Sequence, residues 1–342
     1  MSNSLSGPLD PAADAGWSGH PPRKGFFTDT SVCIGCKACE VACKEWNSVP
    51  EDGLQLLGSS YDNTGALGAS TWRHVAFIEQ PKSLGGQQSG REHNTTTGVS
   101  VADQLNEASG TALEGDRALL GTDTGSVSLG MPSFELPGGR DADGNRTDFR
   151  WLMSSDVCKH CTHAGCLDVC PTGSLFRTEF GTVVVQDDIC NGCGYCVPAC
   201  PYGVIDKRIG DKDTTPKVGV AQKCTLCYDR LGDGLTPACA KACPTESIQF
   251  GDVDELRTRA ERRLASLHSA GVPDAQLYGN DPEDGVGGAG AFFLLLDKPE
   301  VYGLPPDPVV PTRDLPQMWR TAGIAALTLL AGAAAAFVGR SR

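Results

Sequence analysis

The sixteen cysteines are the clearest chemical feature of this chain, because they fall into four groups of four with repeating gaps. In every group two residues separate the first pair of cysteines, and three residues separate the last pair. Thiolates at such short intervals bind soft metals, above all in iron–sulfur clusters or zinc sites. The groups, called quartets one to four, are Cys33, Cys36, Cys39 and Cys43; Cys158, Cys161, Cys166 and Cys170; Cys190, Cys193, Cys196 and Cys200; and Cys224, Cys227, Cys239 and Cys243.

Quartets one and three have the C-x2-C-x2-C-x3-C spacing that is typical of [4Fe-4S] proteins. In this arrangement three close thiolates bind one cubane, and the fourth binds the neighbouring cluster. Small residues in the loops, Gly35, Ala38, Gly192 and Gly194, let backbone N–H groups approach the sulfurs. We therefore expect all sixteen cysteines to be iron ligands of four [4Fe-4S] clusters.

Three other uses of cysteine fit the pattern less well. Zinc prefers two Cys-x2-Cys arms around one ion, and quartet four alone could form such a site with its two separated cysteine pairs. The third cysteine of Cys-x2-Cys-x2-Cys suits zinc poorly. Disulfides need an oxidising compartment and separated partners, and Cys-x2-Cys neighbours are badly placed for them. Unligated core cysteines would not be grouped in fours.

The spacing partly determines how the quartets combine. If each fourth cysteine serves a partner cluster, quartets two and three can form one module because they are close in sequence, and quartets one and four then pair by elimination. A sequential pairing, one with two and three with four, remains open on spacing alone. The provisional ligand sets are Cys33, Cys36, Cys39 and Cys243; Cys224, Cys227, Cys239 and Cys43; Cys158, Cys161, Cys166 and Cys200; and Cys190, Cys193, Cys196 and Cys170.

The elements that position these loops are short. A helix is expected to start near Asp252 and Glu255, with apolar residues at steps of three and four, and to stop at Gly271. Residues 80–147 are rich in Gly, Ser, Thr and Asn and are interpreted as an inserted loop or cap. Strands are expected at residues 71–79, 182–185, 248–250 and 292–296.

Composition narrows the class of protein further. The 42 acidic residues against 29 basic ones give a net charge of -13, which argues against nucleic-acid binding. A hydrophobic fraction of 40% excludes an acidic disordered tail. The 42 glycines and 22 prolines among 342 residues favour a loop-rich fold.

The C-terminal segment predicts a membrane anchor. Residues 322–338 carry no charge, and together with residues 318–321 they span about 31 Å as a helix, enough for a bilayer core. Arg340 and Arg342 follow the span, which favours a cell-membrane protein whose cluster domain lies on the extracytoplasmic side. Residues 1–24 lack the apolar run of a cleavable signal, so such a domain would be exported folded with a signal-bearing partner.

The sequence resembles the iron–sulfur (beta) subunit of membrane-bound formate dehydrogenases, within the electron-transfer subunit family of molybdopterin oxidoreductases. The resemblance covers Gly25 to Asn47 and Trp151 to about Arg320, while residues 80–147 depart from the family pattern. The segments that carry it are Cys33-Ile34-Gly35-Cys36-Lys37-Ala38-Cys39, Lys159-His160-Cys161, Cys190-Asn191-Gly192-Cys193-Gly194-Tyr195-Cys196, Lys223-Cys224-Thr225-Leu226-Cys227 and, for the formate subtype, Asp297-Lys298-Pro299-Glu300-Val301-Tyr302-Gly303-Leu304-Pro305.

The resemblance implies the nested pairing of quartets, with one module inserted in the other. It also implies a catalytic alpha subunit with a molybdenum or tungsten pterin, and a membrane cytochrome b gamma subunit that passes electrons to quinone. Related nitrate reductase subunits carry Trp at the position of Cys193 and hold a [3Fe-4S] centre there. The complete quartets of this chain favour four [4Fe-4S] clusters.

We therefore expect an electron-transfer subunit without a catalytic site, which passes electrons from a formate-oxidising subunit to cytochrome b and quinone. Alternatives are the same wire in a hydrogenase or another molybdopterin oxidoreductase, and a zinc-scaffold membrane adaptor. His160 and His163 are interpreted as groups that bond or pack around a cluster. Candidate cations that tune cluster potentials are Lys37, Lys159, Lys207 and Lys223.

The expected fold is α+β and loop-rich, with two nested ferredoxin-like dicluster modules of short strands and helices, and a C-terminal transmembrane helix. Membrane lipid is an expected partner and nucleic acid is not. The expected segments are a flexible N-terminal segment at 1–24, a four-cluster domain at 25–79 and 151–250, an inserted loop or cap at 80–150, a partner-contact segment at 251–317 and a transmembrane helix at 318–339.

Overall fold

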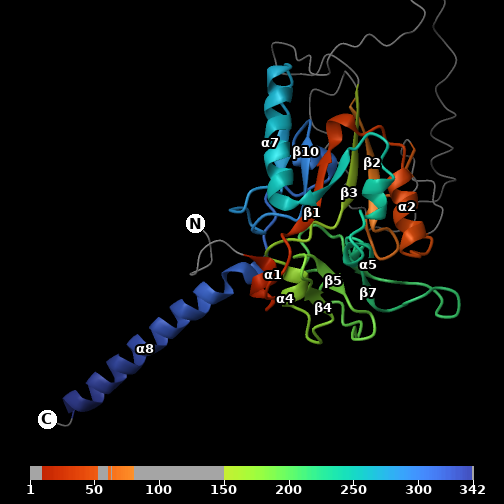
Figure 1. Ribbon diagram of the computed structural model, residues 1–342. Coiled ribbons are helices and arrows are strands. Elements are labelled where there is room, and N and C mark those ends of the chain that lie inside the picture. Colours follow the sequence, from red (N-terminus) through yellow and green to blue (C-terminus); the bar gives the residue numbers. More distant parts are fainter. Residues whose placement is uncertain (1–9, 53–60, 63, 81–149, 341–342) are drawn as a thin grey trace, which may run out of the picture.

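The computed structural model describes residues 10–52, 61–62, 64–80 and 150–340, and it combines short strands with short helices (Figure 1). The strands are β1 (Lys24–Asp29), β2 (Arg73–Gln80), β3 (Arg150–Val157), β4 (Leu175–Arg177), β5 (Val183–Val185), β6 (Asp206–Lys207), β7 (Ala221–Gln222), β8 (Ile248–Asp252), β9 (Gln276–Tyr278) and β10 (Ala291–Leu295). The helices are α1 (Pro11–Asp14), α2 (Ala38–Trp46), α4 (Gly165–Asp168), α5 (Tyr228–Gly232), α6 (Ala238–Lys241), α7 (Val253–Ser269) and α8 (Leu315–Arg340), with 3-10 turns η1 (Thr30–Val32), η2 (Pro299–Tyr302) and η3 (Pro311–Asp314).

The largest sheet joins the two ends of the chain. Its strand order is β8-β1-β10-β9. Strand β1 pairs in parallel with β10 and antiparallel with β8, although both neighbours lie far along the sequence. The N-terminal strand is therefore an inner strand, held on both sides by C-terminal segments.

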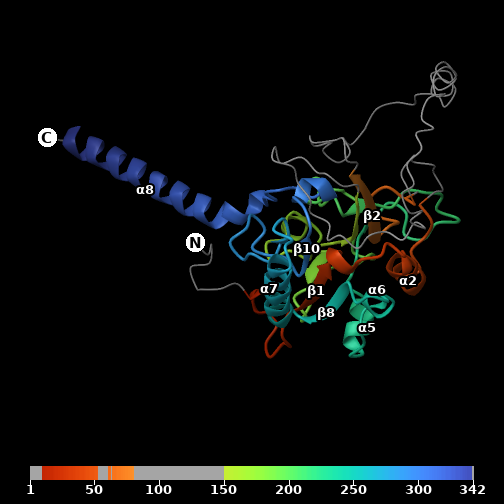
Figure 2. The same ribbon diagram turned by 90° about the horizontal axis from the view of Figure 1, so that it is seen from above.

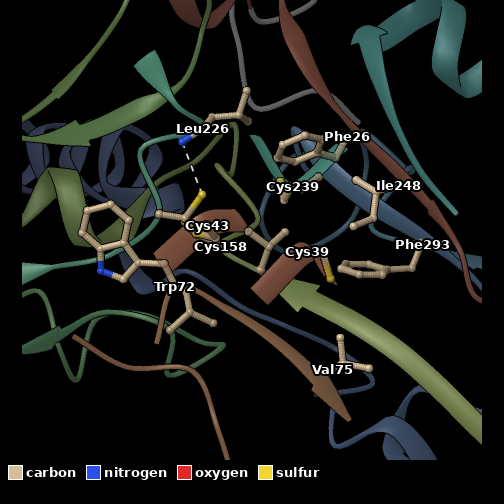
Figure 3. Packing of buried hydrophobic residues seen from close by; sticks show 14 of the residues in the cluster. Phe26, Cys39, Cys43, Trp72, Val75, Cys158, Leu226, Cys239, Ile248 and Phe293 are labelled. Carbon is tan, nitrogen blue, oxygen red and sulfur yellow. Dashed lines mark hydrogen bonds between the residues drawn. The ribbon is translucent and has the colours of Figure 1, made fainter. Parts of the chain in front are cut away.

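The two faces of this sheet bury different partners, because successive side chains of a strand point to opposite faces. Phe27, Phe292 and Leu294 pack in one apolar cluster with helix α7, which covers that face (Figure 1). Phe26 and Phe293 belong to the larger apolar cluster that contains many of the cysteines (Figure 3). The sheet thus has one conventional helix-covered face and one face that supports the candidate metal sites.

Helix α7 begins where the sequence predicts, but its first turn is stabilised differently. Asp252 is the N-cap by position, and its carboxylate forms no side-chain cap to the helix backbone. It pairs instead with the ammonium of Lys24 on β1. The ion pair fixes the start of the helix against the neighbouring strand.

Strands β2 and β3 form a separate antiparallel pair beside α2 and η1. Their ladder runs from Arg73 opposite Val157 to Gln80 opposite Arg150. The expected insert at 80–150 lies outside the described residues except for its two end residues, which close this ladder. Strand β3 itself was not anticipated by the sequence analysis.

Two smaller pairs, β4 with β5 and β6 with β7, frame quartets two and three. The strands expected at 71–79, 182–185, 248–250 and 292–296 are present as β2, β5, β8 and β10, with boundaries shifted by one or two residues at most of their ends. Helix α1 lies within the N-terminal segment for which we expected flexibility, and Asp10 accepts the backbone N–H groups of Ala12 and Ala13 there. The mixed content of helix and strand agrees with the expected class.

Helix α8 projects away from the rest of the molecule in both views (Figures 1 and 2). Its stretch Gln317–Phe337 is apolar, and its most apolar part is not buried inside the structure. Among the described helices it is the one that is long and apolar enough to cross a membrane. A core helix of a soluble protein would bury an apolar surface of this size.

Candidate iron–sulfur centres

Two cavities are each lined by four thiols, three from one quartet and one from another. One is lined by Cys33, Cys36 and Cys39 of quartet one together with Cys243 of quartet four. The other is lined by three cysteines of quartet two together with the last cysteine of quartet three: Cys158, Cys161, Cys166 and Cys200. In both cases the fourth thiol comes from a different quartet, as the ferredoxin spacing predicts.

The remaining eight thiols also have neighbours in a partner quartet. Burial raises the pKa of Cys43 well above its usual range, and the nearby thiolates of quartet four, Cys224, Cys239 and Cys227, raise it further. Burial raises the pKa of Cys196 to about 11, and the thiolates of Cys190, Cys193 and Cys170 add to the rise. Cys43 therefore lies near three thiols of quartet four. Cys196 lies near two thiols of its own quartet and near Cys170, the last cysteine of quartet two.

Left-handed backbone shapes the cysteine loops at one repeated position. The residue before the second cysteine has φ of 66° at Gly35, 72° at Gly192, 44° at His160 and 58° at Leu226. Glycine adopts this conformation freely, whereas other residues lose about 1–2 kcal/mol. At Gly35 a Cβ would also lie 2.7 Å from atoms of two side chains of the β2–β3 pair. The turn places both flanking thiols on the same cavity.

Helix α2 presents thiols to two sites at once. Cys39 lines the cavity of quartet one, while Cys43, one turn later, lies by the thiols of quartet four. Helix α6 packs against α2 and carries Cys239, which precedes Cys243 by one turn in the same way. The two short helices therefore carry thiols of both sites, and Figure 3 shows Cys39, Cys43 and Cys239 in the same buried cluster.

Arg73 at the start of β2 is buried between these two sites, with 1% of its surface exposed. Its Nη2 donates to Cys239 Sγ at 3.4 Å, and its Nη1 donates to Ser155 Oγ at 3.2 Å. The Ser155 hydroxyl is also within 3.2 Å of Cys39 Sγ. Burial alone would lower the pKa of Arg73, but the thiolates around it, led by Cys239, raise it overall. The guanidinium is therefore a permanent positive charge between two groups of thiols.

Two of the four lysines proposed from the sequence are buried beside cysteines. Lys159 and Lys223 are each 1% exposed. The Lys159 ammonium pairs with Asp156 and lies 5.0 Å and 5.1 Å from the ring centroids of two aromatic residues. The Lys223 ammonium donates to the backbone oxygen atoms of Val183 and Cys224. Lys37 is partly buried and pairs with carboxylates, whereas Lys207 is exposed on β6.

The sequence analysis missed Arg73, because it was interpreted as one residue of a predicted strand. The signal that points to it is a charged side chain next to Trp72 and two residues before the apolar run Val75 to Ile78. Isolated charges in such a pattern are paired when they are buried. Here the partners are sulfur atoms from other parts of the chain.

Hydrogen bonds to sulfur prepare some thiols for metal binding. Burial raises the pKa of Cys170, but the Leu175 backbone N–H and the hydroxyls of Ser174 and Thr172 outweigh it and lower the pKa to about 7. The Leu226 backbone N–H donates to Cys224 Sγ at 3.3 Å, drawn as the dashed line in Figure 3. Bonds of this kind stabilise the thiolate, which is the form that binds iron.

Two observations fit iron–sulfur clusters: the set of thiol donors, and a buried nitrogen of His160 that faces a cluster cavity without a partner among the described residues. Among the described residues, no group of three or more His, Cys, Asp or Glu side chains is placed to hold a single metal ion. Around a cubane, by contrast, each thiolate binds a different iron, so the thiols stand further apart. His160 Nε2 is buried and has no hydrogen-bond partner in the part of the chain that the structure describes, and His160 lines the cavity of Cys158, Cys161, Cys166 and Cys200. His163 is not among the residues that line it.

The sites lie in a row. Burial is the main cause that raises the pKa of Cys39 to about 11, and the Cys239 thiolate of the next site contributes to this rise. Burial is the main cause that raises the pKa of Cys224 to about 12, and the Cys158 thiolate of the next site is the second. In the same way Cys166 is close to Cys196. Each site is therefore adjacent to the next.

The two ends of this row reach the surface. Cys36 and Cys193 are the exposed members of the sixteen cysteines, all of which the structure describes. They belong to the first and the last site of the row. Interior sites have no comparably exposed thiol, so contact with another protein is easiest at the ends.

Comparison with known proteins agrees with this chemistry. The sequence profile of the 4Fe-4S dicluster domain matches residues 149–253. The chain is 35% identical over 307 residues to a formate dehydrogenase iron-sulfur subunit of Haemophilus influenzae, with 88% of this chain and 74% of the relative covered. It is 33% identical over 288 residues to the iron-sulfur subunit of the nitrate-inducible formate dehydrogenase of Escherichia coli, covering 83% and 73%.

A more distant relative serves a different reaction. It is a component of the anaerobic dimethyl sulfoxide reductase of Escherichia coli, 28% identical over 236 residues, which cover 69% of this chain and 76% of the relative. The cysteine pattern, the cluster-domain match and the extent of the first two alignments lead to one assignment. This chain belongs to the family of formate dehydrogenase iron–sulfur subunits, the electron-transfer subunits of formate dehydrogenases and related molybdopterin oxidoreductases.

Proposed function

We propose that this chain is a four-cluster wire that carries electrons from a formate-oxidising subunit to a membrane partner. The sixteen cysteines would bind four [4Fe-4S] clusters through thiolate ligands. The proposed ligand sets are Cys33, Cys36, Cys39 and Cys243 (site A); Cys43, Cys224, Cys227 and Cys239 (site B); Cys158, Cys161, Cys166 and Cys200 (site C); and Cys170, Cys190, Cys193 and Cys196 (site D).

The observation that carries this proposal is the mixed origin of the thiols in the two cavities. Cys243 joins three cysteines of quartet one, and Cys200 joins three of quartet two. A sequential pairing of quartets would instead bring Cys170 to quartet one. The nested arrangement, with sites C and D forming the inner module, is the interpretation that these contacts support.

The route follows from the order of the sites, A to B to C to D. Neighbouring sites are joined by the pairs Cys39 with Cys239, Cys224 with Cys158, and Cys166 with Cys196. Electrons would enter and leave at the exposed thiols of sites A and D. The protein needs no acid, base or nucleophile for this task, and the oxidation of formate would belong to an alpha subunit with a molybdenum or tungsten pterin.

The position of α8 supports the direction of transfer. The 3-10 turn η3, which leads into α8, packs against α4, where Thr312 Oγ1 donates to Asp168 at 2.5 Å. Helix α4 also carries Cys166 of site C. We propose that α8 spans the lipid bilayer once, that the C and D end of the wire faces a cytochrome b gamma subunit, and that the cluster domain is extracytoplasmic.

The domain division that accompanies this function is also a proposal. Residues 25–79 and 151–250 would form the cluster domain, and residues 251–317 would contact partner subunits before the membrane helix at 318–339. The sheet supports close packing of residues 251–317 on the cluster domain, because β10 pairs with β1 on the side opposite β8.

The test uses the native complex, solubilised in detergent and kept anaerobic. Formate should rapidly produce several interacting [4Fe-4S]⁺ signals in low-temperature electron paramagnetic resonance, with about sixteen iron atoms per chain. Signals that appear with dithionite but not with formate would reassign the wire to another oxidoreductase, the second candidate that the dimethyl sulfoxide reductase relative supports. About four zinc ions per chain and no iron would refute the proposal.

A further inference from the structure

His160 occupies a backbone position at which two other quartets have glycine. The residue before the second cysteine is left-handed in all four quartets, and glycine fills it in quartets one and three. In quartet four it is Leu226, which is fully buried in the apolar core. Strained non-glycine residues persist where their surroundings determine them strongly. The imidazole of His160 is thus held at this place by its contacts.

Those contacts fix both the orientation of the ring and its proton. The Val183 backbone N–H donates to His160 Nδ1 at 3.1 Å, so Nδ1 is the acceptor and the proton of the neutral ring lies on Nε2. The His160 carbonyl oxygen accepts from Arg23 Nη2 at 2.7 Å and from the Gly290 backbone N–H at 3.3 Å. The residue is 1% exposed. Little freedom remains for the imidazole to turn away.

The Nε2–H group has no protein acceptor among the described residues. A buried donor without an acceptor is rare in native proteins, and it calls for a missing partner. His160 lines the cavity bounded by the four thiols of site C. The sulfur atoms of a cluster in this cavity are the acceptors that the site offers.

Other donors at the cavity are already directed elsewhere. The Lys223 ammonium donates to two backbone oxygen atoms, and the Lys159 ammonium pairs with Asp156. Tyr202 also lines the cavity, so its hydroxyl is the competing donor. A test must therefore distinguish an imidazole nitrogen from a phenol.

We propose that His160 Nε2–H donates a hydrogen bond to the cluster held at site C and raises the reduction potential of that cluster. Reduction adds one electron and thus negative charge to the cluster, so a hydrogen bond to sulfur stabilises the reduced state more than the oxidised one. His160 is a potential-setting residue and takes no electron itself. This inference rests on the proposed cluster at site C.

The matched variants come from the chain itself. His160→Leu places at quartet two the residue that quartet four has at the same position, and it removes the donor. His163→Gln is the control, because it changes a histidine of the same loop that does not line the cavity. Both are made in the full complex, which is purified anaerobically and titrated while its electron paramagnetic resonance is followed.

The expected result is that His160→Leu shifts one of four midpoint potentials downward. A tenfold smaller reduction equilibrium constant corresponds to a shift of about 59 mV for one electron. The other three potentials and the iron content should match the wild type, and His163→Gln should shift none. Unchanged potentials in His160→Leu at full iron content would overturn the inference and leave the four-cluster wire intact.

A second measurement reads the wild-type complex directly and does not depend on the folding of His160→Leu. Complex labelled with 15N-histidine should show a nitrogen coupling to one reduced cluster in electron–nuclear double resonance, together with an exchangeable proton. His163→Gln should keep this coupling. Absence of any histidine coupling in wild-type complex with four reduced clusters would overturn the inference. Loss of an exchangeable proton coupling in Tyr202→Phe would then assign the bond to the Tyr202 hydroxyl. If the wild-type complex holds no cluster at site C, the proposed function is refuted as well.

Discussion

Arg73 offers the sharpest test of how the protein sets the potentials of sites A and B. Its guanidinium is buried between the two sites, and its Nη2 donates to Cys239 Sγ at 3.4 Å. A positive charge stabilises the extra electron of a reduced cluster, so replacing Arg73 with methionine should lower the potentials of both neighbouring clusters.

The magnitude follows from the worth of one hydrogen bond to a charged group, about 1.5–3 kcal/mol. Each 1.36 kcal/mol is a factor of ten in an equilibrium constant, which is about 59 mV for a one-electron couple. If this energy acts wholly in the reduced state, Arg73→Met lowers the potential of site B by up to about 60–130 mV. Site A should shift less, because Arg73 reaches Cys39 through the Ser155 hydroxyl.

The assay is an anaerobic redox titration of the purified complex, followed by electron paramagnetic resonance and paired with iron analysis. Arg73→Lys keeps the charge and should recover most of the potential. Ser155→Ala keeps the charge and removes one bond, so it should shift site A alone. The reasoning is refuted if Arg73→Met retains all four clusters and all four potentials equal those of the wild type.

Four further predictions address the turns, the wire, the anchor and the thiols. Gly35→Ala should abolish one cluster by iron analysis, because its Cβ would lie 2.7 Å from two side chains, whereas Gly173→Ala, with a similar positive φ and open space, should keep full iron. Cys193→Ala should leave formate-dependent reduction of three clusters intact and abolish quinone reduction, and loss of all four signals would contradict this. Deletion of residues 315–342 should release the chain from sedimented membranes; retention there would argue against the anchor. In iron-free protein, alkylation of Cys170 should reach half its maximal rate at a pH of about 7, because its lowered pKa makes it a thiolate above that pH. Mass spectrometry follows the reaction. If Cys170 does not react below pH 8, the hydrogen bonds to its sulfur are contradicted.

Much of the site was predictable because cysteine spacing is a local property. A loop of seven residues such as 33–39 can hold three thiols around one cubane whatever the rest of the fold is. The strands β5 and β10 were also predictable, since they are short apolar runs. Local pattern does not reveal which distant strand becomes a neighbour, so the place of β1 between β8 and β10 required the structure.

Single polar atoms were the least predictable part. The charge of Arg73 is evident from the sequence, but its role depends on thiols of quartets one and four that only the fold brings beside it. His160 was expected near a cluster from its place beside Cys161. Its tautomer depends on the Val183 backbone N–H, which becomes its neighbour only when β5 is in place.

The inner position of β1 has a consequence for the order in which the protein is made. Lys24–Asp29 leaves the ribosome early, but its two neighbours, Ile248–Asp252 and Ala291–Leu295, are synthesised more than 200 residues later. Site A also waits for Cys243, whereas the thiols of sites C and D lie between residues 158 and 200 and are complete much sooner. Maturation should therefore begin in the middle of the chain, and the first cysteines to be translated should be among the last to receive iron.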